Sequence, residues 1–126
     1  MLLLEFVYGV DVITCAAPNL RERPSNRFNQ NNGDHGVKVS DRELLEIHKK
    51  GLTRILDVAA LNNAEVVILG AFGCGAFQNK PEVVARAAKE VITEYLHVFK
   101  TIEFAVYCSP RDDTNFRVFK RVLGMM

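Results

Sequence analysis

The stretch VVILGAFGCGAFQNKP, residues 66–81, sets the architecture of this chain. Its first four residues, VVIL, are apolar and mostly β-branched, which predicts a buried strand. Pro81 suits the first turn of a helix, where its missing N–H would have no partner. The loop between them carries three glycines, Gly70, Gly73 and Gly75. A strand, a glycine-rich loop and a helix in this order are typical of one βα unit of an α/β protein.

The glycine-rich loop predicts an anion-binding site. Glycine lets the backbone take positive φ and approach a ligand closely, because there is no Cβ to collide with it. The helix that begins at Pro81 adds free amides and the positive end of its dipole. Phe72 and Phe77 flank the glycines and offer a stacking or packing face. We therefore expect a phosphate-bearing ligand, with a purely structural turn as the alternative.

Two common phosphate motifs do not fit this loop. Gly70 and Gly75 have the spacing of a Walker loop, but Ala76 and Phe77 follow where Lys and Ser or Thr are required. The dinucleotide fingerprint fails because Gln78 stands at its third glycine position. The loop therefore predicts an anion site of another kind.

Composition indicates one ordinary globular domain spanning residues 1–126. The chain has 126 residues and is 48% hydrophobic, which is enough apolar material for a core. Sixteen basic and fifteen acidic residues leave a formal charge of +1, so we expect neither a nucleic-acid nor a membrane partner. The opening Met-Leu-Leu-Leu is interrupted by Glu5 and lacks a basic leader, so we expect no signal or membrane segment. With three reduced cysteines, we expect a cytoplasmic protein.

The first third of the chain predicts a strand, a loop and a helix. Val10–Ala16, VDVITCA, has the composition of a strand covered on both faces. Residues 19–36 form a long polar connection without period, which is either a lid or a mobile loop. Ser40-Asp-Arg-Glu43 matches a capping box and predicts a helix that reaches about Asn62. Its apolar face is expected to hold Leu44, Ile47, Leu52, Ile55, Leu56 and Ala59. We interpret His48, within this helix, as a surface or packed histidine rather than a base.

The last third predicts a helix, a strand and a second, shorter helix. The helix after Pro81 is expected to bury Val84, Ala87, Ala88, Val91, Ile92 and Tyr95. Ile102–Cys108 predicts a strand, and Asp113 or Thr114 can cap a final helix with Phe116, Phe119, Val122 and Leu123 on its inner face. The order βαβαβα predicts a mainly parallel sheet in a three-layer α/β/α arrangement. Ligands bind such sheets beyond the carboxyl ends of the strands, which would gather residues 18–19, 70–78 and 109–115 at one rim.

Three cysteines, Cys15, Cys74 and Cys108, fall near that rim. They contain no CxxC pair and no accompanying histidine, so we predict no metal site and interpret them as small residues packing at strand ends. Cys15 and Arg21 have the Cys-x5-Arg spacing of cysteine phosphatases. Such a loop must run directly into a helix to lower the thiol pKa, and Pro18 argues against one here. A Cys15-dependent phosphatase stays open as an alternative.

Three blocks of the sequence resemble the microbial-type poly(ADP-ribose) glycohydrolase family, which has the macro-domain fold. They are VDVITCAAPN at residues 10–19, ILGAFGCGAFQNKPEVVA at residues 68–85, and a strand followed by the helix of Asn115 and Phe116. The resemblance spans nearly the whole chain. It covers only the C-terminal half of the family's domain and so implies a partial macro domain.

The resemblance implies ADP-ribose or poly(ADP-ribose) as the ligand, and neither a cofactor nor a metal. It implies that the amides of Gly73, Cys74, Gly75, Ala76 and Phe77 hold the diphosphate, with Phe72 in the same ligand-binding set. Phe77 would pack against the distal ribose. Asn115 and Phe116 would border the adenosine end.

Catalysis does not follow from the resemblance. The family's Gly-Gly-Gly loop and adjacent Glu pair have no counterpart here, and glycosidic cleavage needs an acid to protonate the departing oxygen. Glu5, Glu22 and Glu82 are the nearest acids, and the helix dipole suffices to explain Glu82. Four functions stay open: an ADP-ribose binder that is inactive alone, a hydrolase completed by a partner or dimer through open sheet edges, the phosphatase, and a structural remnant.

Overall fold

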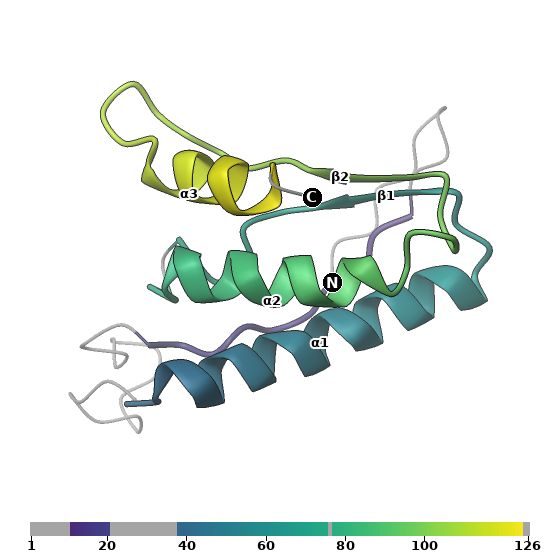
Figure 1. Ribbon diagram of the computed structural model, residues 1–126, viewed down its shortest axis with the longest axis horizontal. Helices are drawn as coiled ribbons and strands as arrows, with labels where there is room; N and C mark the ends of the chain where they lie inside the picture. Colours follow the sequence, from purple (N-terminus) through teal and green to yellow (C-terminus); the bar gives the residue numbers. More distant parts are fainter. Residues whose placement is uncertain (1–10, 21–37, 76, 125–126) are drawn as a thin grey trace.

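The computed structural model describes residues 11–20, 38–75 and 77–124 (Figure 1). The elements in these residues are α1 (Asp41–Leu61), β1 (Val66–Leu69), α2 (Pro81–Thr93), β2 (Thr101–Phe104) and α3 (Thr114–Leu123). Helices alternate with parallel strands, so the predicted α/β class is confirmed. In the described parts, no helix is both long and apolar enough to cross a membrane.

The predicted capping box forms at the start of α1. The Ser40 hydroxyl accepts a hydrogen bond from the Glu43 amide at 3.1 Å, which satisfies one orphan donor of the first turn. At the other end the helix stops at Asn62, and Asn63 has a φ of 59°. Asn tolerates this left-handed conformation better than most residues, and the helix ends within one residue of the predicted Asn62.

The two strands pair in parallel across the α2 connection. Val66 lies opposite Thr101, and Leu69 lies opposite Phe104. The strand predicted for Ile102–Cys108 therefore ends earlier than its composition suggests. A strand needs a partner, and the last contact with β1 is the hydrogen bond from the Ala105 amide to the Leu69 carbonyl at 2.7 Å.

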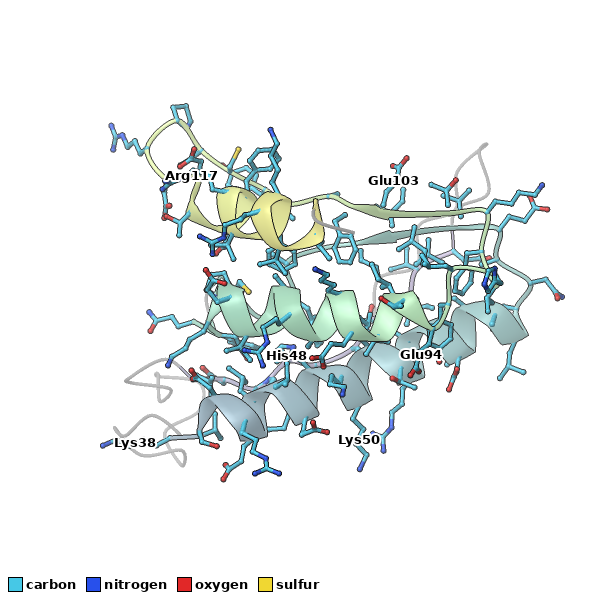
Figure 2. The ribbon with its side chains drawn as sticks, viewed as in Figure 1. Lys38, His48, Lys50, Glu94, Glu103 and Arg117 are labelled. Carbon is cyan, nitrogen blue, oxygen red and sulfur yellow. The ribbon has the colours of Figure 1, made fainter. Side chains whose placement is uncertain are left out.

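All three described helices pack on one face of this sheet. On that face Val67, Leu69, Ile102 and Phe104 contact apolar residues of the helices. On the opposite face Val66 and Ile68 are 53% and 65% exposed, and Figure 2 shows Glu103 pointing away from the helices. The described residues thus form two layers, and the predicted third layer is not found among them.

Helix α2 is the centre of the core. Figure 1 shows it between α1 and α3. Toward α1, Val91 and Ile92 pack with Leu56 and Ala59, and toward α3, Val84 and Ala85 pack with Phe119. Ion pairs cross both contacts: Lys49 of α1 with Glu90 at 3.3 Å, and Arg121 of α3 with Glu82.

Two predicted core residues are exposed. Ile47 of α1 and Phe116 of α3 are each 42% exposed. Unlike α2, the helices α1 and α3 each bury a single row of side chains, because each packs on its neighbours from one side only. Leu44, His48 and Leu56 form the row on α1, with Phe119 in the corresponding place on α3, and the two exposed residues lie off these rows.

The strand predicted for Val10–Ala16 is wrong for the residues that the structure describes. Residues 11–16 form no strand and are exposed, and Val10 lies outside the described residues. β-branched composition favours extended backbone but supplies no partner, and this segment makes no ladder with β1. The predicted polar loop, residues 19–36, lies outside the described residues except for Asn19 and Leu20.

Candidate functional site

The loop that follows β1 is folded by its own backbone hydrogen bonds. The Cys74 amide donates to Ala71 at 3.0 Å, the Gln78 amide to Gly75 at 3.0 Å, and the Asn79 amide to Gly73 at 2.9 Å. Two residues have left-handed backbone, with φ of 77° at Gly73 and 55° at Gln78. The loop is therefore a compact turn that leads into α2 with a fixed shape.

The side chain of Asn79 holds several parts of this loop together by hydrogen bonds. Its side-chain Nδ2 donates to the carbonyls of Pro18 at 2.7 Å, Gly73 at 2.9 Å and Phe77 at 3.3 Å. The residue is only 2% exposed. One amide side chain thus ties the loop to itself and to the segment that ends at Leu20.

His48 reaches the loop from α1. Its Nε2 lies 2.8 Å from Asn79 Oδ1, and its ring packs edge-on against Phe72 with centroids 5.7 Å apart. Because Oδ1 can only accept, Nε2 is the donor and carries the proton. Burial lowers the pKa of His48 from its usual value, and the hydrogen bond to Asn79 opposes that shift in part. The imidazole is therefore neutral at pH 7.

The amides of Gly73 and Gly75 point to no described acceptor. Neither N–H donates to any backbone or side-chain group in the part of the chain that the structure describes. A Cβ added at Gly75 would meet nothing within 4 Å. No side chain caps the start of α2, which follows directly. Two donors and open space at a helix N-terminus make this a place where an anion can bind.

The predicted rim segments meet at this loop. The Leu20 amide donates to the Phe77 carbonyl at 2.9 Å. Asn115, in the first turn of α3, donates through Nδ2 to the Cys74 carbonyl at 3.3 Å. The exposed ring of Phe116 follows it, with Lys120 Nζ 5.9 Å from the ring centroid. Of the predicted ligand residues, Ala76 lies outside the described residues.

Among the three candidate acids, the structure places one. Glu82 lies in the first turn of α2 and forms an ion pair with Arg121 of α3. Glu5 and Glu22 lie outside the described residues. The Glu82 carboxylate therefore has a structural partner in Arg121, as well as a favourable position at the positive end of the helix dipole.

The three cysteines have different surroundings. Cys74 is half-buried beside Val84 and Phe119, and burial raises the pKa of its thiol to about 12, so it stays protonated and unreactive. Cys15 and Cys108 are exposed, which corrects the prediction that they pack at strand ends. In the described residues, no three metal-ligating side chains gather.

The described residues lend no support to the phosphatase alternative. The described residues that follow Cys15, up to Leu20, form no helix, so no helix N-terminus lies there to stabilise a thiolate. Arg21, the other half of the Cys-x5-Arg pattern, lies outside the described residues. A Cys15-dependent phosphatase therefore stays a prediction.

A cavity of about 1070 Å³ lies beside the loop rather than in it. Residues 11–15 form one wall, and β1 and α1 form the other. Its described lining includes Gly70 and Phe72 but not Gly73, Cys74, Gly75 or Phe77. The cavity lies between the unpaired segment, residues 11–16, and the rest of the fold. It is separate from the candidate anion site.

Sequence reasoning missed the role of Asn79 and underrated His48. One signal was available for His48, because it stands four residues from Leu44 and Leu52 on the apolar row of α1. A histidine in such a row is buried and needs a hydrogen-bond partner. Nothing in the sequence distinguishes Asn79 from other residues that precede a helix.

No protein family model and no curated protein matches this sequence. Solved structures do match it. Poly(ADP-ribose) glycohydrolase from Deinococcus radiodurans in complex with ADP-ribose is 32% identical over 67% of this chain and 34% of that chain, with a TM-score of 0.61. Its apo form gives 32% identity over 67% of this chain and 35% of that chain, with a TM-score of 0.60. A second crystal form of the complex gives 31% over 68% of this chain and 36% of that chain, with a TM-score of 0.59.

These matches confirm the resemblance to microbial-type poly(ADP-ribose) glycohydrolases and the macro-like α/β fold. The chain spans about a third of the length of the bacterial protein that it matches. It is therefore similar to a part of that protein.

Proposed function

We propose that this chain binds ADP-ribose and that the glycine loop holds its diphosphate. The observation that carries the proposal is the pair of amides at Gly73 and Gly75, which have no described acceptor and lie in the loop that leads into α2; at Gly75 an added Cβ would meet nothing within 4 Å. Such amides favour an anion both by donating hydrogen bonds and through the helix dipole. The bacterial proteins that the chain resembles include complexes with ADP-ribose, which supports this choice of anion.

The remaining ligand residues have places that suit the two ends of ADP-ribose. We assign Phe77 to the distal ribose, with Phe72 behind the loop against His48. Asn115 and Phe116 border the adenosine end, because Asn115 is held against the loop and the Phe116 ring is 42% exposed, which leaves part of it able to stack. Cys74 and Ala76 contribute backbone, and the Cys74 amide shapes the loop by donating to Ala71.

We further propose that the chain binds without hydrolysing when alone. Cleavage needs an acid beside the anomeric carbon, and Glu82, the described candidate, is engaged by Arg121. The Glu pair of the family has no counterpart in this sequence. Poly(ADP-ribose) would then be held by a terminal ADP-ribose unit.

One observation favours a second candidate, a hydrolase completed by another chain or a second copy. The sheet face with Val66 and Ile68 is open, and β1 pairs along one edge only among the described strands. Release of ADP-ribose from poly(ADP-ribose) by a purified oligomer would replace the binding-only proposal with this one. A monomer that binds and does not cleave would exclude it for the chain alone.

Calorimetric titration with ADP-ribose tests the proposal. Wild type is compared with Gly75→Glu, which puts bulk and negative charge where the diphosphate would lie. Because a Cβ added at Gly75 would meet nothing within 4 Å, the variant should fold normally, as circular dichroism would check. We expect saturable heat from wild type and none from Gly75→Glu.

Gly51→Glu is the matched control. Gly51 lies on α1, and a Cβ added there would also meet nothing within 4 Å, so the same charge is added outside the loop. This variant should bind like wild type. Equal binding by Gly75→Glu, or no heat from a folded wild-type chain, would contradict the proposal.

A further inference from the structure

The candidate site is backed by a buried polar pair that the proposed binding contacts do not use. His48 and Asn79 are 3% and 2% exposed, and they hydrogen-bond each other between α1 and the loop. Figure 2 shows His48 in the layer between α1 and α2. Polar side chains are costly in such a place unless every group is satisfied, and a leucine would continue the row of Leu44 and Leu52. The pair therefore calls for a role beyond packing.

We propose that His48 and Asn79 are a positioning pair that holds the glycine loop in the conformation able to receive a diphosphate. This inference rests on the proposed function of the loop. It concerns residues that lie behind the ligand surface and act through the backbone. Neither residue is assigned a contact with ligand.

Asn79 sets the direction in which the loop carbonyls point. Asn79 Nδ2 draws the carbonyl oxygens of Gly73, Phe77 and Pro18 toward the interior. Carbonyl oxygens carry partial negative charge, so any that turned outward would repel an approaching anion. Holding them inside leaves the amides to define the potential at the loop surface.

His48 in turn sets the orientation of the Asn79 amide. If this amide flipped, its oxygen would face three carbonyls and its nitrogen would face His48. The His48 Nε2–H donates to Oδ1 at 2.8 Å and so selects the orientation in which Nδ2 faces the carbonyls. His48 thus sets Asn79, and Asn79 sets the loop.

The contact between His48 and Asn79 depends on the protonation state of His48. The neutral Nε2–H tautomer makes the required bond, and Nδ1 donates to no acceptor among the described residues. A second proton would place a charge and an unsatisfied N–H in a site that is 3% exposed. Protonation therefore favours opening of the contact between α1 and the loop.

The charged groups around His48 leave it without a dedicated counter-ion in the described structure. Lys49 is paired with Glu90 of α2 at 3.3 Å, and Lys80 at the start of α2 is paired with Asp41 at 2.8 Å. The other titratable groups on the surrounding elements are Glu46 and Lys50 on α1, Cys74 in the loop, Glu82, Arg86 and Lys89 on α2, and Asp11 and Cys15 in the segment that lines the same cavity as His48. Between Asp11 and Cys15, only the Asp11 carboxylate could favour the imidazolium ion of His48.

The pH dependence has a defined sign. The pKa of His48 is lowered in the folded chain, while the unfolded value is about 6.5. The unfolded chain thus binds more protons around that pH, so the contribution of the pair to stability is complete above about pH 6.5 and falls as pH drops toward the folded pKa. The diphosphate keeps its charge in this range. ADP-ribose affinity should therefore fall with decreasing pH, whereas a histidine that attracted the ligand by its charge would raise it.

The test titrates ADP-ribose into the full chain at several pH values between about 5.5 and 7.5, which brackets the usual histidine pKa. His48→Leu keeps the apolar row and removes the donor, and we expect affinity at pH 7.5 to fall about tenfold, as for loss of a buried hydrogen bond. His48→Gln can place an amide N–H near the Nε2 position, so it should restore affinity to within about threefold of wild type and abolish the pH dependence. Asp11→Asn is the control and should keep the wild-type pH profile.

Two results would overturn the inference: His48→Leu binding as tightly as wild type, or His48→Gln retaining the full pH dependence. A second readout needs no ligand. In NMR spectra of wild type, the Gly73 amide shift should follow the His48 ring titration with the same midpoint, and a Gly73 signal that ignores the His48 titration would also overturn it. If wild type fails to bind ADP-ribose, the proposed function fails, and this NMR titration still decides whether the pair positions the loop.

Discussion

Gly73 and Gly75 lie two positions apart and do different work in the same loop. Gly73 has a φ of 77°, and a Cβ there would stand 2.8 Å from both the Ala17 Cβ and the Asn79 Nδ2. Both the backbone conformation and the space around it require glycine. A Cβ added at Gly75 would meet nothing within 4 Å. Gly73 thus maintains the shape of the loop, and Gly75 leaves room for the proposed ligand.

Alanine substitutions separate these two roles. Gly73→Ala should lower the free energy of unfolding by about 1–3 kcal/mol, because a left-handed residue gains a Cβ that collides with its neighbours. Gly75→Ala should change it by less than about 0.5 kcal/mol, as for an exposed position without contacts. Urea denaturation of both variants measures the difference. Equal stability losses would show that the loop is not held as described.

The sequence predicts which residues form the loop, but not which glycine maintains its shape and which one leaves space for a ligand. Three glycines and two phenylalanines indicate a close approach of backbone to ligand, whichever glycine provides it. The division depends on Asn79, whose side chain crosses to Pro18, a residue 61 positions away in the sequence. The contact from His48 crosses 31 positions. Neither is visible in local patterns, because side-chain hydrogen bonds between distant residues leave no spacing rule.

Among the elements, those with a local start signal were predicted most closely. The capping box before α1, Pro81 at the start of α2 and the turn before α3 each fix a helix by chemistry within a few residues. The strands depend on a partner instead. β2 ends where β1 ends, and residues 11–16 have strand composition without a ladder. Pairing is a property of two segments, so one segment cannot predict it.

Hydrogen–deuterium exchange tests the unpaired segment. The amides of residues 12–15 should exchange at nearly the rate of an unfolded chain, because they are exposed and belong to no ladder. The amides of Val91 and Ile92, buried in α2, should be the reference for slow exchange. Protection of residues 12–15 comparable to that of α2 would mean that the segment does pair with β1.

The whole molecule is a two-layer piece of an α/β fold in its described parts. α2 joins α1 and α3 into one layer, and the strands form the other. The composition predicted the class, and the order of elements predicted the parallel pairing. The number of layers could not be predicted, because it depends on what covers Val66 and Ile68, and helix periodicity says nothing about which face of a sheet a helix takes.

The functional conclusion also belongs to the molecule as a whole. The loop, the first turn of α3 and the segment that ends at Leu20 come from three distant parts of the chain and meet at one place. The part of this chain that matches covers about a third of the bacterial glycohydrolase, and Glu82, the described candidate acid, is paired with Arg121. We therefore propose binding of ADP-ribose as the activity of this part of the fold by itself.

The most direct measurement is an NMR titration of the chain, labelled with nitrogen-15 at its eight glycines, with ADP-ribose. We predict that the amide signals of Gly73 and Gly75 move and saturate together, because their N–H groups gain phosphate oxygens as acceptors. The signals of Gly51 on α1 and Gly124 after α3 should stay in place. If Gly73 and Gly75 do not respond while the chain is folded, or if only glycines outside the loop respond, the glycine loop is not the ADP-ribose site.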